Sequence, residues 1–272
     1  MSRPDQSITF LREFGYSVFR LPRAGAQPLE VMHRDGKDLS RLGVLDQLID
    51  PGVVPMPTVH RDAAPGIDLE GKETSRINVA IGVNILGSFI GALGGGNLGL
   101  SGAFSKARTV TFTYTGVMED RVDVLALESF VHAGTIRPFI PAGTLDKLID
   151  DEVYAVTAVL KTRSIVVSAQ GEAGRAVGLE VPIIRNAIGG SLKVDAEGEL
   201  SSAIRFEGEA PVAFALQAVQ LVFDEDAQLS TTQPLEPGGA AARSLQPRAS
   251  ATSAREGPKF LQPRGAFVRV SL

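Results

Sequence analysis

Three histidines are the side chains in this sequence best suited to bind a metal ion, and their spacing does not favour a site. His33, His60 and His132 are far apart, and none belongs to a His-x-x-x-His pair or stands at a ligand spacing from carboxylates. The chain contains no cysteine, which excludes thiolate ligands and disulfide bonds. We therefore predict no metal site, and interpret each histidine as an ordinary core or surface residue.

The other candidate chemistry is phosphate binding or hydrolysis. The glycines between Gly91 and Gly102 lack the lysine-serine pair of a phosphate loop and follow an expected helix, whereas a dinucleotide-binding loop follows a strand. No Gly-x-Ser-x-Gly motif is present, and the acidic groups at 150–151 and 224–226 lie at expected element ends, where solvated charge is ordinary. The sequence thus predicts no catalytic residue, no cofactor and no enzyme.

Length and composition indicate a folded body. With 272 residues and 44% hydrophobic content, the chain can bury a full core and form one domain with appendages. A formal net charge of −4 from dispersed charges disfavours nucleic acid as a partner. Arg3, Pro4 and Asp5 stand where a signal peptide would need an apolar run, so we expect a cytoplasmic protein.

The elements expected from hydrophobic periodicity give an α+β fold with a twisted, mainly antiparallel central sheet and short surrounding helices. Strands are predicted at 15–21 and 28–33 as a hairpin, and at 77–82, 109–115, 153–160, 164–169, 176–183, 192–195 and 212–223. Helices are predicted at 42–49, capped by Ser40, and at 83–93, 122–131 and 144–149. The clearest pattern is 109–115, where Val110, Phe112 and Tyr114 alternate with threonines.

Residues 77–105 carry no charge, which raises the question of a membrane-spanning helix. Gly82, Gly87, Gly91 and the run from Gly94 make a continuous helix poor, because each interior glycine costs about 1 kcal/mol relative to alanine. We therefore interpret this segment as a buried strand, a short helix and a glycine turn.

The composition changes after residue 228. Residues 229–258 are rich in Ser, Thr, Ala, Gly, Pro and Gln, which predicts a flexible linker. Residues 259–272 regain apolar character, and we expect this tail to dock through Phe260, Phe267, Val268 and Val270. From residue 240 onward the formal charge is +5, against −4 for the whole chain, so the remainder carries −9 and the opposite charges favour docking.

Several stretches resemble bacterial gasdermins in character and in order. They are FLREFGYSVFRLPR and PLEVMHRDGKDLSRLG near the N-terminus, the block INVAIG to TYTGV at 77–117, VYAVTAVLKTRSIVV at 153–167 and VAFALQAVQLVFDED at 212–226. The resemblance covers residues 10–226. That family commonly carries an acylated cysteine within its first few residues, which this chain lacks, so palmitoylation has no acceptor here.

The resemblance implies a pore-forming domain at 1–228, a linker with an activation cleavage site at 229–258, and an autoinhibitory peptide at 259–272. It further implies that a trypsin-like or caspase-like protease cuts in the linker, where Leu245 is the preferred site and Arg243, Arg248 and Arg255 are the other candidates. The monomer would then assemble into a large ring and form a β-barrel pore in the inner membrane, killing the cell in antiviral defence.

In such a pore, membrane lipid is the partner of the strands. Residues 77–86 are expected to pair with the strand at 108–117 once the helix between them unfolds. The glycines of that helix either ease this conversion or allow tight packing of a core helix. Val110, Phe112 and Tyr114 are expected to face lipid while the intervening threonines face the lumen. A second membrane hairpin is expected from 152–160 and 163–182. Two other functions remain open for this chain. It could be a peptide-latched binding module that forms no pore, or a lipid-acting enzyme.

Overall fold

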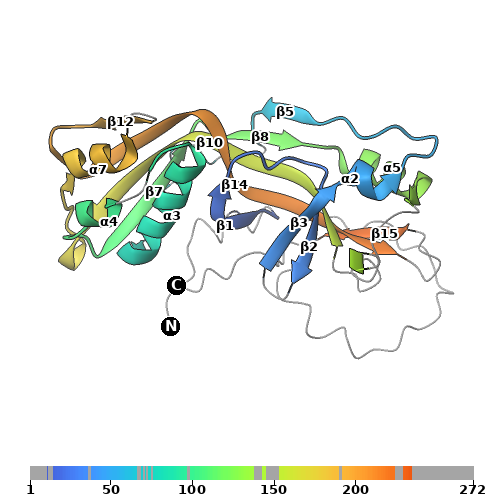
Figure 1. The fold of residues 1–272 in the computed structure, drawn as a ribbon, viewed down its shortest axis with the longest axis horizontal. Helices are drawn as coiled ribbons and strands as arrows, with labels where there is room; N and C mark the ends of the chain where they lie inside the picture. Colours follow the sequence, from blue (N-terminus) through green and yellow to red (C-terminus); the bar gives the residue numbers. More distant parts are fainter. Residues whose placement is uncertain are drawn as a thin grey trace.

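The computed structural model describes residues 11, 15–35, 38–65, 69, 71, 73–74, 76–96, 99–137, 143–144, 153–189, 192–223 and 229–234. Figure 1 shows an elongated body built on two long strands, β10 (Val153–Gln170) and β14 (Ala203–Phe223). They pair antiparallel from Tyr154↔Gln220 to Ser168↔Ala203. Every other strand of the main sheet pairs with one of these two or with a strand that does.

The remaining strands flank this pair on both sides. On the β14 side lie β12 (Lys193–Ala196), β1 (Ser17–Arg23) and β15 (Leu229–Pro234). On the β10 side lie β7 (Thr109–Thr115), β8 (Met118–Arg121) and β2 (Glu30–Asp35). The outermost strands are β6 (Ile77–Asn78) on β7, β5 (His60–Ala63) on β8 and β3 (Asp38–Val44) on β2. Two small sheets pair β4 (Ile49–Asp50) with β9 (Thr135–Ile136) and β11 (Leu179–Glu180) with β13 (Leu200–Ser201).

The helices lie at the two ends of the sheet (Figure 1). At one end are α3 (Val79–Ala92), α4 (Leu100–Ala103), α7 (Val181–Ile188) and the 3-10 turn η1 (Glu172–Gly174). At the other end are α2 (Leu45–Leu48) and α5 (Val124–Ala133). Each end has its own hydrophobic cluster, the larger one under α3, α4 and α7.

The expected fold class is confirmed, and so is the strand 109–115, which is β7 with the same bounds. The helix expected at 83–93 is α3, which begins four residues earlier. Asn78 caps it, since its side-chain oxygen accepts a hydrogen bond from the backbone N–H of Ala80 at 3.0 Å. The strand expected at 77–82 is therefore wrong beyond Asn78. The helix 122–131 and the strands 192–195 and 212–223 are confirmed within a few residues, although β14 starts at Ala203.

Other expectations are wrong, mostly because pairing partners are far apart in sequence. The strands at 15–21 and 28–33 form no hairpin, as β1 pairs with β14, and β2 with β3 and β10. The strands expected at 153–160 and 164–169 are one continuous strand, so no turn separates them near residue 161. The strand expected at 176–183 is β11 followed by α7, in which Val181, Ile184 and Ile188 are buried at helical spacing.

Smaller differences concern the ends of elements. Only Leu45–Leu48 of the expected helix 42–49 is helical, because the preceding residues pair with β2. The expected linker starts at residue 229, but Leu229–Pro234 forms β15 on the edge of β14. The remainder of that linker, the tail, and most of the expected helix 144–149 lie outside the described residues.

Candidate functional site

Two connections leave the main sheet at the same end, on the left in Figure 1. The β6–β7 connection (residues 79–108) contains α3 and α4, and the β10–β14 connection (residues 171–202) contains η1, β11, α7, β12 and β13. The ladders that border them stop at Asn78↔Thr109 and at Ser168↔Ala203. Helices α3 and α4 of the first connection and α7 of the second fold back onto one face of the sheet and form a layer that covers it, whereas β12 pairs with β14 within the sheet.

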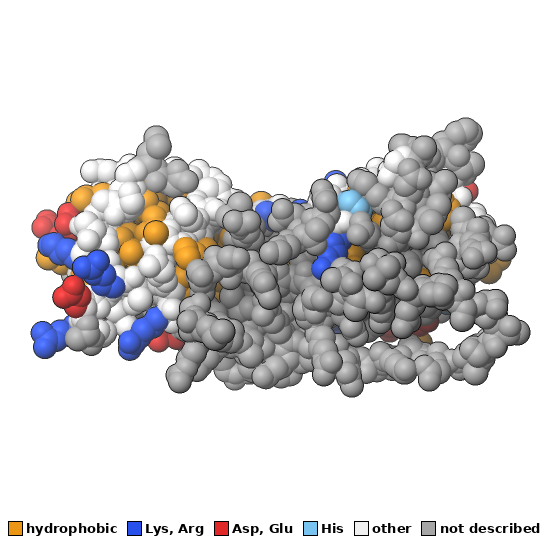
Figure 2. Space-filling view, turned by 90° about the horizontal axis from the view of Figure 1, so that it is seen from below, with side chains coloured by type: hydrophobic (Ala, Val, Ile, Leu, Met, Phe, Trp, Pro, Cys, Tyr) orange, Lys and Arg blue, Asp and Glu red, His pale blue; other side chains and the backbone are white. Residues whose placement is uncertain are grey.

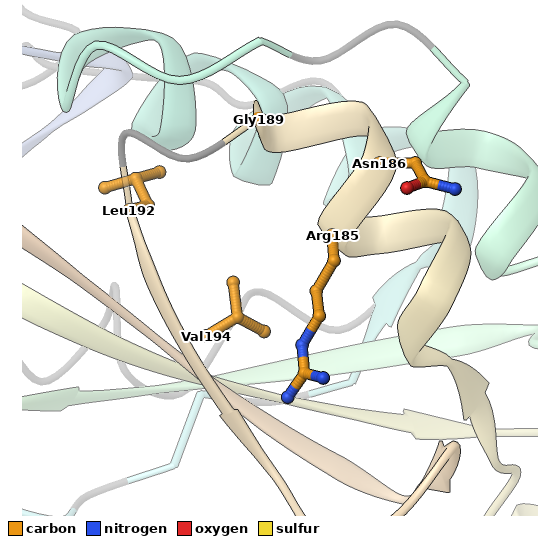
Figure 3. A pocket seen from close by; sticks show the side chains of 5 residues that line it. All are labelled: Arg185, Asn186, Gly189, Leu192 and Val194. Atoms are coloured by element: carbon orange, nitrogen blue, oxygen red, sulfur yellow. The ribbon is translucent and has the colours of Figure 1, made fainter.

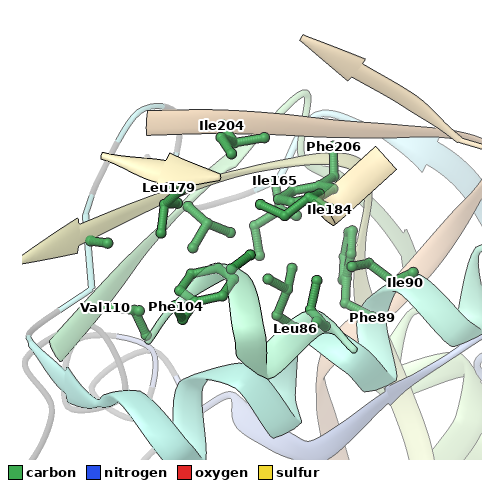
Figure 4. Packing of buried hydrophobic residues seen from close by; sticks show 14 of the residues in the cluster. Leu86, Phe89, Ile90, Phe104, Val110, Ile165, Leu179, Ile184, Ile204 and Phe206 are labelled. Carbon is green, nitrogen blue, oxygen red and sulfur yellow. The ribbon is translucent and has the colours of Figure 1, made fainter. Parts of the chain in front are cut away.

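The covered face is strongly apolar. It consists of Val110 and Phe112 of β7, Ile165 and Val167 of β10, and Ile204 and Phe206 of β14, each at most 1% exposed. Leu86, Phe89 and Ile90 of α3, Phe104 after α4, and Ile184 of α7 pack onto these strands (Figure 4). The helical layer therefore keeps water from an apolar surface at the end of the sheet where both connections begin.

The three residues expected to face lipid belong to this core in the structure described. Val110 and Phe112 are each 1% exposed. Tyr114 is half-buried and stacks on Phe214 of β14, with the ring centroids 4.2 Å apart. All three point to the same face of the sheet, as their alternation with threonines predicts.

The glycines of the β6–β7 connection fall into two groups. A side chain at Gly82 would place its Cβ 1.9 Å from Val110 Cγ2, so Gly82 allows α3 to approach β7 closely. Gly91 and Gly102 lie in helices without positive φ, and an added Cβ would meet no atom within 4 Å. Tight packing thus accounts for Gly82, whereas neither packing nor backbone conformation requires glycine at Gly91 or Gly102.

The two connections contact each other at the end of α3. Gly96 donates its backbone N–H to the carbonyl of Ile188 at 3.2 Å. A Cβ on Gly95 would lie 2.8 Å from Leu192 and 3.2 Å from Ile188. The turn after α3 and the end of α7 therefore hold each other in place.

A shallow hollow of ≈ 530 Å³ opens beside the end of α7 (Figure 3). It is lined by Arg185, Asn186, Gly189, Leu192 and Val194. Seen from below, the described surface at this end shows hydrophobic side chains gathered together, with charged ones at the margin (Figure 2). Since α3 itself carries no charged residue, its outer face contributes only neutral side chains.

A buried ion pair lies at the middle of the sheet, where β5 covers the edge of β8. Lys161 donates to Asp120 at 2.7 Å and to Asp62 at 2.9 Å, and the Asp62 backbone N–H donates to Asp120 at 2.8 Å. The hydrogen bond from Lys161 holds the pKa of the Asp62 carboxyl below its usual value. These contacts tie β5 to β8 and β10, and the sequence patterns did not indicate them.

A second buried contact joins Tyr16 to Glu119 of β8, with the tyrosine hydroxyl donating to the carboxylate. Burial, followed by the neighbouring carboxylate, raises the pKa of Tyr16 above its usual value. Glu30 is also buried and accepts hydrogen bonds from Arg23 at 2.8 Å and Arg41 at 2.7 Å. These pairs join β1, β2, β3 and β8 into one body.

The histidines are not brought together. His33 is buried in β2, His60 is exposed in β5, and His132 lies 3.9 Å from Glu128 in α5. Among the described residues no three side chains of His, Cys, Asp or Glu are placed to hold a metal ion. Within the same residues, no helix combines the length and the hydropathy that a membrane span requires.

The candidate cleavage residues and the tail residues belong to the part of the chain that is not described. The cleavage candidates are Arg243, Leu245, Arg248 and Arg255, and the tail residues are Phe260, Phe267, Val268 and Val270. The geometry of the described body therefore does not test the roles expected for these cleavage and tail residues.

Comparison with known proteins gives a consistent result. The model of the Bacterial Gasdermin Family matches residues 19–230. The chain is 34% identical to a gasdermin from a Desulfuromonadales bacterium over 98% of each chain, and 34% identical to one from Lysobacter enzymogenes over 91% of each. The fold is similar to the structure of a bacterial gasdermin from Bradyrhizobium tropiciagri, with a TM-score of 0.58, 16% identity, and coverage of 85% of this chain and 92% of the other.

Proposed function

Since this chain belongs to the bacterial gasdermin family, we propose that it is an autoinhibited pore-forming protein that proteolysis near its C-terminus activates. The cut chain assembles into a large ring and forms a β-barrel pore in the inner membrane. Before the cut it is a cytoplasmic monomer. Loss of the membrane barrier then kills the cell in antiviral defence.

The observation that carries the proposal is the pair of connections that leave the sheet at one end and cover its apolar face. A backbone in the hydrocarbon core of a bilayer must satisfy all its polar groups internally, so strands can enter only as part of a closed barrel. Two connections that start from existing antiparallel ladders can lengthen those ladders into hairpins. Each hairpin would then carry the apolar face of the sheet into the membrane.

This arrangement changes the expected second hairpin. Because β10 is continuous through residues 160–164, the second hairpin grows from the end of β10 and the start of β14, and not from arms at 152–160 and 163–182. The first hairpin grows from β6 and β7, as expected. Val110, Phe112 and Tyr114 lie on its lipid side.

Activation requires the inhibitory peptide to leave. Phe260, Phe267, Val268 and Val270 contribute about 1.5–3 kcal/mol each when fully buried, which holds the tail while it is covalently attached at a high effective concentration. A cut after Leu245 removes the high effective concentration of the tail without changing any contact that the tail makes. Arg243, Arg248 and Arg255 are the other candidate positions for a trypsin-like or caspase-like protease.

The test places a unique protease site at Leu245 and follows dye release from vesicles with and without that protease. Release only after cutting supports the proposal, and light scattering should show one chain before the cut. A cut chain that stays monomeric and releases no dye, although the peptide has dissociated, would falsify it. Altered lipid chemistry without dye release would instead point to a lipid-acting enzyme. If the lipid is unaltered and no dye is released, a binding module is indicated.

A further inference from the structure

One lateral edge of the main sheet, formed by β7 and β8, is covered by the chain that precedes β7. Strand β5 pairs with β8, and β6 pairs with the start of β7 (Figure 1). Between them, Gly71 donates its N–H to the Tyr114 carbonyl at 3.4 Å, and Thr74 donates its N–H to the Phe112 carbonyl at 2.8 Å. We call residues 60–63, 71 and 74 the edge strap.

The edge strap occupies backbone groups that β8 turns away from the centre of the sheet. Val122, directly after β8, donates its N–H to a β10 carbonyl at 2.9 Å. Successive residues of an antiparallel strand alternate in the direction of their hydrogen bonds, so the N–H groups of Glu119 and Arg121 point away from β10. Ala63 pairs with Glu119, and His60 pairs with Arg121. Strand β5 therefore covers the outward groups of β8.

Strand β5 is itself an irregular strand. Its two ladder pairs are three steps apart along β5 but two steps apart along β8, so β5 contains an extra residue. Asp62 in this bulge has a φ of 53°, in the left-handed region. Pro57 and Pro65, which have no N–H to donate, stand on either side of β5. Bulges and prolines of this kind keep the edge of a sheet from pairing with another chain.

The side-chain contacts of β5 can be lost without leaving a buried charge unpaired. Asp62 lies 2.9 Å from Lys161 and Arg61 lies 3.7 Å from Asp120, but the Asp62 and Arg61 side chains are 60% and 56% exposed. Ion pairs this exposed contribute little to stability. Lys161 also contacts Asp120 at 2.7 Å, and these two residues belong to β10 and β8. The buried Asp120 would therefore keep its closest cation if β5 left.

The main sheet has two lateral sides. Strands β5 and β6 lie on one of them, and β1, β12 and β15 lie along β14 on the other. A closed barrel has no free edge. In a ring of identical copies, one side of each copy meets the opposite side of the next copy. The side that the edge strap covers is therefore one of the two sides that such a ring needs.

Building on the pore-forming function proposed above, we infer that the edge strap is a second restraint on assembly, which acts after the C-terminal tail has left. Strand β5 leaves β8, and the outward backbone groups of Glu119 and Arg121 pair with a second copy of this chain. The contact between Lys161 and Asp120 stays in place. While β5 remains on β8, it keeps cut chains from joining through this edge.

A disulfide between β5 and β8 tests whether the edge strap must leave. His60→Cys/Arg121→Cys places two cysteines at directly opposite positions that are exposed in the fold, at a spacing that suits a disulfide, and the natural chain has no cysteine. After complete cleavage, the oxidised variant should release little or no dye from vesicles of phosphatidylcholine and phosphatidylglycerol. A reductant should restore release.

The matched control for this disulfide is Thr113→Cys/Val166→Cys. These positions are also directly opposite each other, but they join β7 to β10 in a ladder that the inferred change leaves intact. The cut control should release dye at the same rate in its oxidised and reduced forms.

A weakened edge strap should have the opposite effect. Asp62→Ala removes the contact with Lys161, and the control Asp50→Ala removes a comparable contact with Arg137 in the small β4–β9 sheet. The two carboxylates are 60% and 54% exposed. An exposed ion pair changes an equilibrium by a factor of roughly two to five, so Asp62→Ala should speed dye release about two- to fivefold. Asp50→Ala should leave the rate unchanged.

Amide hydrogen exchange, resolved by residue, tests the pairing with a second copy. In the described fold the Asp62 N–H donates to Asp120 at 2.8 Å, and in vesicle-bound pores it should exchange freely. The amides of Glu119 and Arg121 should stay protected in the same pores, because a strand of the next copy replaces β5.

Dye release by the cut wild-type chain separates this inference from the proposed function. If that chain releases no dye, the pore-forming function is wrong. If it releases dye and the oxidised His60→Cys/Arg121→Cys variant releases it equally fast, the edge strap need not leave and the inference is wrong. Free exchange at Glu119 and Arg121 in the pores would overturn the pairing with a second copy. Equal rates for Asp62→Ala and Asp50→Ala would overturn the contribution of the contact with Lys161.

Discussion

Gly91→Ala/Gly102→Ala should make the uncut protein more stable and the cut protein slower to form pores. Both glycines lie in helices, have no positive φ, and leave open space where a Cβ would stand. Alanine restricts the unfolded chain and favours the helix, which stabilises the described fold by about 0.4–1 kcal/mol at each position. The double variant should therefore gain about 1–2 kcal/mol.

The added stability of the helices opposes their conversion to strands. If α3 and α4 must unravel before insertion, the barrier rises by up to the stabilisation, and dye release should slow by roughly 5- to 30-fold. Urea denaturation of the uncut chain measures the stability, and the release rate from vesicles after complete cleavage measures the conversion. The final extent of release should remain unchanged.

Gly82→Ala is the control, because its Cβ would stand 1.9 Å from Val110 Cγ2 and must displace α3 or β7. This variant should be less stable than the wild type, by about 1–3 kcal/mol. A Gly91→Ala/Gly102→Ala protein that gains stability but releases dye at the wild-type rate would refute the requirement for helix unravelling. If the double variant gains no stability, the conclusion that neither packing nor backbone conformation requires glycine at these two positions is wrong.

Three further outcomes follow from the polar contacts. Lys161→Met leaves the buried Asp120 carboxylate without its closest cation and should lower the free energy of unfolding by about 3 kcal/mol in urea. Asp62→Asn should be less stable than the wild type at neutral pH. The folded-state pKa of Asp62 is lowered, so the stabilisation from its carboxylate is present above its usual pKa of 3.8 and is lost as the pH falls through the lowered value. The difference in stability between Asp62→Asn and the wild type should therefore vanish when both are melted in acid. Asn78→Ala removes the cap of α3 and should cost about 1 kcal/mol in thermal denaturation and speed dye release.

The sequence alone determined the elements whose periodicity is local. Strand β7 shows its alternation within seven residues, and α5 and the core of α3 show helical spacing within three turns or fewer. The family resemblance rested on such stretches in order, and the comparisons confirm it. The expected α+β class follows from the same local patterns.

The strand pairing was decided by tertiary structure. Nothing local distinguishes β1 pairing with β14, about 200 positions away, from a hairpin with its neighbour β2. The continuity of β10 through Lys161 was equally hidden, because the polar residues Lys161, Thr162 and Arg163 resemble a turn. In the fold, Lys161 instead contacts Asp120 on the adjacent strand. Long-range partners therefore make these polar residues compatible with a strand.

The two connections show both what the sequence alone determines and what only the tertiary structure decides. Residues 176–183 and 77–82 alternate well enough to be read as strands, yet residues 181–183 and 79–82 are helical. The reason is that α3 and α7 bury more apolar surface by packing on the sheet than isolated strands could. The sequence determined that both segments hold two compatible patterns. Only the tertiary structure decided which pattern is used, since it supplies the apolar face of β7, β10 and β14 that the helices cover.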